Sequence, residues 1–407
     1  MKHIYIFNEG SRAAEYGIGT YIQQMIIILR KFRDVSLNII NLNSSVSEFI
    51  HEVIDNYHVY SIPSSSIIQL NNSEKYLENI WFLVNPSIKS LRSNNLIFFI
   101  NYYQDYQLVL LIKSQYPSSK IYFVVHYQEW CFSLKGDVSY FRQIIYTDKL
   151  LLNEKEKEVL KSYENEIKIL NEVDRIICLS NFTKNLLRDE YLIPQEKLIV
   201  IYNGLQNDGI VLLDNEKSEL KKKLLIPIEE KIILFVGRLD EIKGVDILIK
   251  AFKRIVESYN YFHLVIIGDG KLSSHLNDGR GIWRKITFTG HLNKADLYKF
   301  YQIADIGVMP SMHEQCSYVA IEMMMFGIPL IISTTTGLNE MIDDEDWKYK
   351  FHINNSLTAE IILSNLIVDI LKLDNQSYQL LCNMIKLNYD NRYSLTIMER
   401  FIKQLIK

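Results

Sequence analysis

The residues whose types and spacing most suggest chemistry are two glutamates, Glu314 and Glu322, in the segment EQCSYVAIE. Apolar residues 306–309 predict a buried strand before Glu314, and a helix that opens at Ser317 or Tyr318 carries Glu322. Ligands of doubly wound sheets bind where strands end and helices begin, because the unpaired N–H groups of a helix start attract anions. The segment therefore predicts a phosphate site, although a lone pair of glutamates is more often two solvated charges at a helix end.

Two cations follow another predicted strand upstream. The segment ILFVGRLDEIKGVDILIKAF, residues 233–252, predicts a buried strand, a turn at Gly237, a loop with Arg238 and Lys243, and then a helix. A further apolar strand ends in a Gly-Asp-Gly turn that begins at Gly268. Each cation alone fits an ordinary exposed loop. Together with the two carboxylates and a helix N-terminus, the cations predict a site that binds a diphosphate and polyhydroxyl groups.

Motifs in both halves of the chain carry a family resemblance. In the second half they are GRLDEIKG, GDG, FTG and PSMHEQCSYVAIEMMMFGIPLIIS. In the first half they are KHIYIFNEGSRAAEYGIGTYIQQM, IYFVVHYQEW, VDRIICLSNFTKNLL and EKLIVIYNGL. These motifs resemble those of retaining nucleotide-sugar glycosyltransferases of family four, the glycosyl transferases group 1. The resemblance spans nearly the whole chain, is weakest over residues 44–95 and 127–172, and is specific in combination, since each glycine turn alone is a weak signal.

The resemblance implies the GT-B fold, an α/β architecture of two doubly wound Rossmann-like domains that face each other across a cleft. Apolar strands and amphipathic helices alternate twice along the chain, which is consistent with mainly parallel sheets. We expect residues 1–205 to form an acceptor-side domain and residues 206–390 a nucleotide-sugar-binding domain. By resemblance, a C-terminal helix at about residues 391–407 packs back on the first domain. A helix over residues 21–33 should pack on the first sheet through one apolar stripe.

The resemblance also implies roles for individual residues. Arg238 and Lys243 would neutralise the departing diphosphate, Glu314 would hold the donor sugar, and Glu322 would accept hydrogen bonds from ribose hydroxyls. His126, directly after a predicted strand, would lie at the sugar. The expected catalytic residues are thus Glu314, His126, Arg238 and Lys243. The expected donor-binding residues are Glu322, Gly237, Gly268, Cys316, Ser317, Tyr318 and Val319. The expected acceptor or phosphate loop holds Gly17 and Gly19.

These roles imply transfer of a hexose, with retention of anomeric configuration and without a metal, from a nucleotide-diphosphate sugar to a hydroxyl acceptor. A surface polysaccharide or glycoconjugate is the expected product, with a saccharide, lipid-linked or peptide acceptor. We expect no cofactor, a uridine diphosphate (UDP) sugar as first candidate donor and a guanosine diphosphate (GDP) sugar as second. The alternatives are a non-catalytic GT-B subunit that binds a partner or sugar nucleotide, and another GT-B enzyme such as a sugar-nucleotide epimerase.

Some of these residues also have purely structural interpretations. His126 fits a hydrogen-bonded histidine at a strand end, and Gly17 and Gly19 fit a simple turn of the chain. Cys316 fits either a reactive thiol at a helix start or a buried apolar residue. Residues 344–346, Asp-Glu-Asp, mimic a metal-binding triplet of other sugar transferases, but their polar surroundings favour a solvated acidic loop. We therefore expect no metal site.

Composition argues against other classes of function. The 407 residues suit two domains, and a net charge of −3 with interspersed signs argues against a nucleic-acid partner. Four scattered cysteines suit a reducing compartment and free thiols. No apolar run approaches the length of about 20 residues that spans a bilayer. We expect a cytoplasmic protein, and peripheral contact with the inner membrane face stays open because many members of the resembling family act on lipid-linked acceptors.

Overall fold

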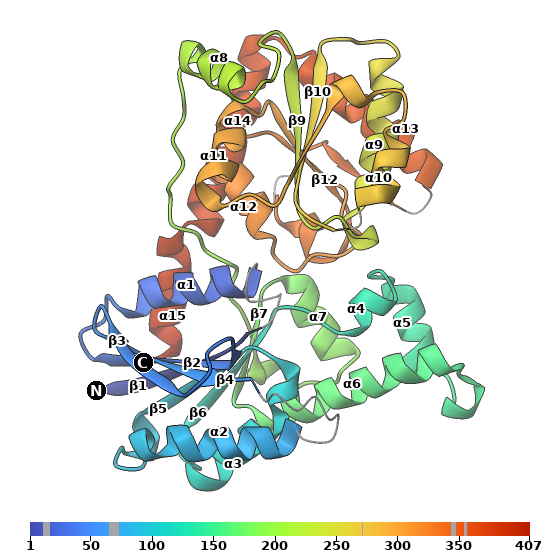
Figure 1. Cartoon of the computed structure of the whole chain (residues 1–407). Coiled ribbons are helices and arrows are strands. Elements are labelled where there is room, and N and C mark those ends of the chain that lie inside the picture. The colour runs from blue at the N-terminus through green and yellow to red at the C-terminus, as the bar shows by residue number, and fades with distance from the viewer. Residues whose placement is uncertain (11–16, 65–72, 271, 343–346, 354–355) are drawn as a thin grey trace. The chain divides into compact units, whose positions relative to one another are not determined.

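The computed structural model describes residues 1–10, 17–64, 73–270, 272–342, 347–353 and 356–407, and the acidic triplet at residues 344–346 lies outside them. The chain divides into two compact units (Figure 1). The first unit comprises residues 1–133, 138–203 and 398–407, and the second comprises residues 134–137 and 204–397. The C-terminal segment thus belongs to the same unit as the N-terminal half of the chain.

A mainly parallel sheet forms the centre of the first unit. In the described residues it has eight strands in the order β3-β4-β2-β1-β5-β6-β7-β8, and β3 is antiparallel to β4. The strands are β1 (Lys2–Glu9), β2 (Val35–Ser44), β3 (Ile50–Ile54), β4 (Tyr57–Pro63), β5 (Leu96–Ile100), β6 (Lys120–Val125), β7 (Arg175–Cys178) and β8 (Leu198–Val200). The sequence did not predict β3, because its side chains are mostly exposed and the short edge strand has no alternating apolar face.

Helices cover both faces of this sheet: α1 lies on one face, and α2 and α3 lie together on the other (Figure 1). Buried Ile18, Ile22 and Met25 recur at helical spacing along α1, which explains why this helix packs on the sheet. The helices of this unit are α1 (Gly17–Leu29), α2 (Ser73–Ile88), α3 (Tyr106–Gln115), α4 (Trp130–Ser133), α5 (Val138–Ile145), α6 (Glu154–Glu172), α7 (Asn181–Asp189) and most of α15 (Leu395–Leu405).

Helix α1 differs from the sequence prediction at both ends. It runs from Gly17 to Leu29, whereas residues 21–33 were expected to be helical. Gly17 and Gly19 lie in its first turn, so their placement in a preceding loop was wrong, and their contact with a ligand stays a prediction. At the other end, the residues after Leu29 form a turn, because the chain must reverse direction before β2 begins at Val35.

A parallel sheet of six strands forms the centre of the second unit in the described residues, in the order β11-β10-β9-β12-β13-β14. The strands are β9 (Lys231–Val236), β10 (Phe262–Ile267), β11 (Ile286–Gly290), β12 (Ile306–Met309), β13 (Leu330–Ser333) and β14 (Lys350–Phe351). Successive strands are added on one side of β9 up to β11, and on the other side from β12 onward. The strand order therefore reverses between β9 and β12, which is the position where open α/β sheets bind ligands.

Helices also cover both faces of the second sheet: α9 and α13 lie together on one face, and α11, α12 and α14 on the other (Figure 1). They are α8 (Asp214–Lys223), α9 (Val245–Val256), α10 (Leu272–Asp278), α11 (Lys294–Ile303), α12 (Tyr318–Met325), α13 (Ser356–Leu371) and α14 (Asn375–Asn388). Residues 206–213 form neither helix nor strand before α8 begins. Within the described parts of the chain, no helix has both the length and the apolar character to cross a bilayer.

Candidate functional site

A cation and a carboxylate predicted from the sequence meet at the carboxyl ends of β9 and β12, where the strand order reverses. Lys243 lies in the loop after β9, and Glu314 lies in the loop after β12. The Lys243 ammonium is 2.6 Å from Glu314 Oε1, and the two side chains are 19% and 13% exposed. Ser311 donates its hydroxyl to the same carboxylate oxygen at 3.1 Å. Two segments that are far apart in sequence thus present one ion pair at the end of the sheet.

Gly244 allows the two loops to approach closely enough for this ion pair. Its φ of +65° lies in the left-handed region, and a Cβ atom there would be 2.1 Å from the carbonyl oxygen of Pro310. Nearby, the Met312 N–H donates to the carbonyl of Ile242 at 2.7 Å, so the loops share a backbone hydrogen bond. Backbone geometry therefore holds the two charges together, in addition to their own attraction.

A third loop, after β13, fixes the backbone of Glu314. The Glu314 N–H donates to Thr336 Oγ1 at 3.0 Å, and the Thr336 hydroxyl donates to the Glu314 carbonyl at 2.8 Å. The Gly337 N–H donates to the same carbonyl at 2.9 Å. Thr336 holds a φ of +38°, which is rare for a β-branched residue. Sequence reasoning missed this loop, although the run TTTG after an apolar strand contains residues typical of turns.

Arg238 follows the turn at Gly237, in the loop after β9. Its Nη2 lies 2.9 Å from Asp240 Oδ2, and its side chain is one-third exposed. Gly268 supports this loop: its φ is +144°, and a Cβ atom there would be 1.8 Å from the carbonyl oxygen of Gly237. The Gly268 N–H also donates to the carbonyl of Gly290 at 2.9 Å. The glycine turns after β9 and β10 therefore stack on each other through their backbones and meet the end of β11.

Glu322 lies inside α12 and is hydrogen-bonded within the second unit. The Tyr301 hydroxyl, on α11, donates to Glu322 Oε2 at 2.7 Å. The rings of Tyr298 and Phe326 pack against the Tyr301 ring, with centroids 5.9 and 5.4 Å away. Burial raises the pKa of the Glu322 carboxyl to about 7. Near neutral pH the group is therefore divided between an acid, which donates one hydrogen bond, and a carboxylate, which only accepts them.

The start of α12 follows directly after the β12 loop. Ser317 is the N-cap, and its Oγ accepts a hydrogen bond from the Ala320 N–H at 3.4 Å. Tyr318 and Val319 are the first two helical residues, so their N–H groups belong to the turn that has no helical carbonyl to bind. Cys316 is 6% exposed and is not part of a disulfide, which favours the buried, apolar interpretation of this residue. The other three cysteines form no disulfide either.

His313 is a neighbour of the ion pair to which sequence reasoning gave no role. It precedes Glu314 directly and is 7% exposed. Burial lowers the pKa of its imidazole to about 4, so the ring is neutral at neutral pH. Its Nε2 lies 3.4 Å from Nε2 of Gln315. The motif PSMHEQ contains this histidine, and its position beside the glutamate was the available signal.

The other predicted residues, His126, Gly17 and Gly19, belong to the first unit. His126 follows β6, and its Nε2 lies 2.9 Å from Asn101 Oδ1. Because this amide oxygen only accepts, the ring carries its proton on Nε2. The Tyr21 ring meets the imidazole edge-on at 4.9 Å, and burial lowers the pKa of His126 to about 3. His126 is thus a neutral, hydrogen-bonded residue at a strand end, and its expected place at a sugar stays a prediction.

The second unit therefore brings cations, carboxylates and a helix start to the position where the strand order of its sheet reverses. Positive charge from Lys243 and Arg238 suits a diphosphate, and carboxylates suit the hydroxyls of a sugar or a ribose. Among the residues that the structure describes, no three His, Cys, Asp or Glu side chains are grouped as a metal ion would require.

Comparison with known proteins gives matching families for both halves of the chain. Residues 216–377 match the family described as glycosyl transferases group 1, and residues 121–208 match Glycosyltransferase Family 4. An uncharacterized glycosyltransferase of Methanocaldococcus jannaschii is 36% identical over 42% of this chain and 45% of its own length. An alpha-monoglucosyldiacylglycerol synthase of Streptococcus pneumoniae is 26% identical over 47% of this chain and 45% of its own length. The chain spans about half the length of the curated relatives it matches.

Solved structures match over the whole chain. Sucrose-phosphate synthase from Thermosynechococcus elongatus has a TM-score of 0.76 at 17% identity, and the match covers 100% of this chain and 98% of that one. The Anabaena protein HepE, in complex with UDP and glucose, has a TM-score of 0.71 at 14% identity, with coverage of 100% and 99%. The likeness confirms the predicted GT-B fold. The two family matches, over residues 121–208 and 216–377, support the identification of this chain as a glycosyltransferase of family four, the glycosyl transferases group 1.

Proposed function

We propose that this protein transfers a hexose from a nucleotide-diphosphate sugar to a hydroxyl acceptor, with retention of anomeric configuration and without a metal ion. The observation that carries the proposal is the Lys243–Glu314 ion pair, which lies where the strand order of the second sheet reverses. The pair offers a cation for the departing diphosphate and a carboxylate for sugar hydroxyls. The two family matches support the same reaction class.

In the proposed reaction, the bond between the anomeric carbon and the diphosphate oxygen breaks, and its electron pair leaves with the diphosphate. Lys243 and Arg238 stabilise that charge together with the first-turn amides of α12. Glu314 accepts hydrogen bonds from the sugar, and Glu322 accepts them from the ribose. The acceptor oxygen attacks the same face of the sugar that the diphosphate leaves, and its proton passes to the leaving phosphate. No protein side chain acts as general base in this scheme.

A UDP sugar is the donor we propose first, and a GDP sugar second. The Anabaena neighbour is described with UDP, with UDP and glucose, and with UDP-glucose, which supports a uridine donor. The proposed acceptor is a hydroxyl of a saccharide, a lipid-linked molecule or a peptide, for a surface polysaccharide or glycoconjugate. The names of two relatives, a D-inositol 3-phosphate glycosyltransferase and an alpha-monoglucosyldiacylglycerol synthase, fit hydroxyl acceptors of this breadth.

Hydrolysis of the donor in the absence of acceptor tests the proposal. The protein is incubated with UDP-glucose, UDP-N-acetylglucosamine or GDP-mannose, with and without EDTA, and released nucleotide and sugar are followed by proton NMR. A retaining transferase should release nucleotide and initially the α-anomer of the sugar, and EDTA should have no effect. Activity that EDTA abolishes and Mg²⁺ restores would reject metal independence.

The same experiment separates the alternatives. An epimerase would yield the epimer of the supplied sugar, whereas a non-catalytic subunit would be stabilised by a nucleotide but would release none. Lys243→Ala serves as the control for contaminating hydrolases, because it should release far less nucleotide than the unaltered protein. A protein that neither releases nucleotide nor gains thermal stability with any donor would contradict the proposal.

A further inference from the structure

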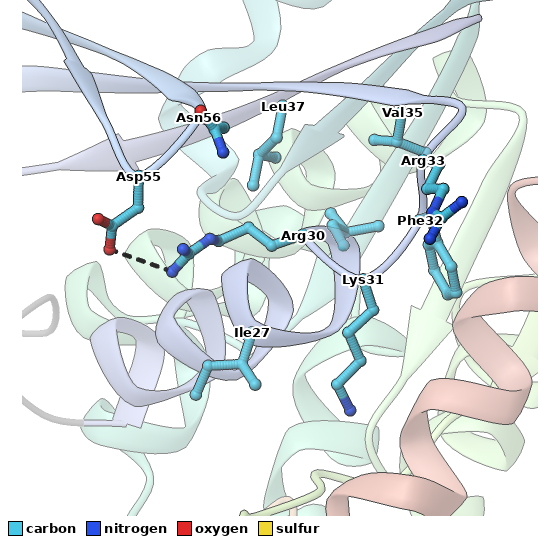
Figure 2. Close-up of a pocket in the computed structure, with 10 residues that line it drawn as sticks. Ile27, Arg30, Lys31, Phe32, Arg33, Val35, Leu37, Asp55 and Asn56 are labelled. Atoms are coloured by element: carbon cyan, nitrogen blue, oxygen red, sulfur yellow. Dashed lines mark ion pairs between the residues drawn. The ribbon is translucent and has the colours of Figure 1, made fainter.

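The first unit contains a pocket that the proposed transfer does not use. It has a volume of about 470 Å³, follows the end of α1, and is lined by residues that include Arg30, Phe32, Arg33, Val35, Leu37 and Asp55 (Figure 2). A smaller pocket of about 180 Å³ is lined by residues that include Lys2, Phe32, Asp34, Val35 and Lys403. Phe32 and Val35 line both pockets, so the two adjoin. We name the two pockets together the basal groove.

The basal groove lies at the opposite end of the first sheet from His126. Lys2 and Val35 begin β1 and β2 and are paired in register. His126, in contrast, follows the carboxyl end of β6, and β6 runs parallel to β1 through β5. The strand β1 has eight residues, which corresponds to a length of about 25 Å. The groove is therefore separate from the edge of this sheet where His126 lies.

Two cations at the groove are already compensated within the protein. Arg30 lies 3.4 Å from Asp55, in the turn before β4, and Figure 2 shows the guanidinium pointing toward that carboxylate. Lys31 points away from Asp55 in the same view, and its ammonium is 2.6 Å from Glu399 on α15. These pairs stabilise the turn after α1, and they do not neutralise the other charged residues of the groove.

Further cations that line the groove, Lys2, Arg33, Lys403 and Lys407, have no such compensation among the described residues. Among the described residues, no carboxylate lies within ion-pair distance of Lys2, Arg33 or Lys403, and Asp34 is the only unpaired acid that lines the groove. Lys403 has its ammonium 5.9 Å from the ring centroid of Phe32, a distance typical of a cation–π contact. Arg33 lies beyond the end of α1 at Leu29, outside the last turn in which a cation complements a helix end. Lys403 lies in the last turn of α15 and also complements a helix end, whereas Lys2 lies on β1 and has no such explanation.

We propose that the basal groove binds an anion of the phosphate class, in the form of a phosphate monoester or diester. A phosphate group has several oxygens that accept charge-assisted hydrogen bonds from Arg33, Lys2 and Lys403. The apolar side chains of Phe32, Val35 and Leu37 are available to the organic part of the ester. The volume of the larger pocket falls within the usual range for small-molecule sites. The proposal does not rest on glycosyl transfer.

Calorimetric titration of the full chain with phenyl phosphate tests this site. The variant Arg33→Gln/Lys403→Gln removes two of the uncompensated cations. Its matched control is Lys155→Gln/Lys161→Gln, which removes the same charge from two exposed positions on α6 of the same unit. We expect the groove variant to bind about tenfold more weakly or worse, and the control variant to bind as the unaltered protein does. Hydrolysis of the donor should be unchanged in both variants.

Vesicles distinguish a free phosphate ester from a lipid headgroup. The protein is sedimented with vesicles of phosphatidylglycerol in phosphatidylcholine, and with phosphatidylcholine alone. Binding to the anionic vesicles that phenyl phosphate displaces would identify a lipid headgroup, and binding to phenyl phosphate without vesicle binding would identify a free ester. Either binding must be lost in Arg33→Gln/Lys403→Gln. Equal binding by that variant, or no binding of either probe to the unaltered protein, would overturn the proposal.

Discussion

The hydroxyl of Tyr301 donates to Glu322 Oε2 at 2.7 Å and thereby links α11 to α12. The hydrogen bond favours the carboxylate form, whereas burial favours the neutral acid. Burial is the stronger effect, since the pKa of Glu322 is raised to about 7. Glu322 therefore changes its charge in the pH range in which donor binding is measured. Only its ionised form accepts hydrogen bonds from both hydroxyls of a ribose.

UDP binding should therefore strengthen as the pH rises through about 7, the pKa to which burial raises Glu322. Calorimetric titrations with UDP between about pH 6 and 8 measure this dependence. The nucleotide phosphates also titrate, so Glu322→Gln is the control: it keeps the shape of the side chain but has no charge to lose. The variant should bind UDP more weakly at high pH and with a smaller pH dependence. An identical dependence in both proteins would show that the titration of Glu322 does not govern UDP binding.

Substitution of Gly268 by alanine should destabilise the protein by about 3 kcal/mol, because the new Cβ atom meets a backbone oxygen and the φ is unfavourable for alanine. In the present structure that Cβ would be 1.8 Å from the Gly237 carbonyl oxygen. Urea unfolding of the full chain measures the change. Gly17→Ala is the matched control, because a Cβ there meets nothing within 4 Å. Gly17→Ala should change the free energy of unfolding by less than about 1 kcal/mol. The change should be stabilising, because alanine is the better helix former.

Gly17→Ala also tests the expected ligand contact at the start of α1. If the backbone of Gly17 approaches an acceptor or a phosphate closely, the added methyl group should reduce transfer while stability is kept. Unchanged transfer would leave Gly17 with a purely structural role in the first turn of the helix.

The segments around Lys243 and Glu314 were predictable because each has a strong local signal. Short apolar strands before glycine and proline turns identified both loops, and both strands are present. The family resemblance then supplied the GT-B fold and the roles that local patterns do not carry. Prediction was poorest where local signals are weak, as in β3 and at the ends of α1.

Contacts that depend on the order of strands in a sheet could not be predicted from local pattern. Thr336 binds the backbone of Glu314 only because β13 lies beside β12. Tyr301 meets Glu322 because α11 and α12 lie on the same face of the sheet. Neither partner differs in sequence context from an ordinary threonine in a turn or an ordinary tyrosine on a helix, so three-dimensional packing alone selects them.

His126 should make the protein less stable as the pH falls. Its pKa is lowered from 6.5 to about 3 in the folded protein, so between these values the unfolded chain binds a proton that the folded chain does not. The contribution of His126 is therefore present above about pH 6.5 and is lost as the pH falls toward 3. Melting temperatures of the unaltered protein and of His126→Gln are measured across this range. The difference between them should be smallest at acidic pH. Parallel curves would show that His126 titrates normally.

Replacement of Lys243 gives the most direct test of the proposed leaving-group role. Lys243→Ala should lower the rate of donor hydrolysis by about a hundredfold or more, since a preorganised charge at the departing group is removed. Lys243→Arg keeps the charge and should retain part of the rate. Lys253→Ala, at an exposed lysine on α9, is the control and should hydrolyse the donor normally. Because Lys243 and Glu314 form one ion pair, Lys243→Ala/Glu314→Gln should lose much less than the sum of the two single losses. A Lys243→Ala enzyme within about threefold of the unaltered rate would contradict the leaving-group role. If the loss of rate in the double variant equals the two single losses combined, the proposed coupling between Lys243 and Glu314 is contradicted.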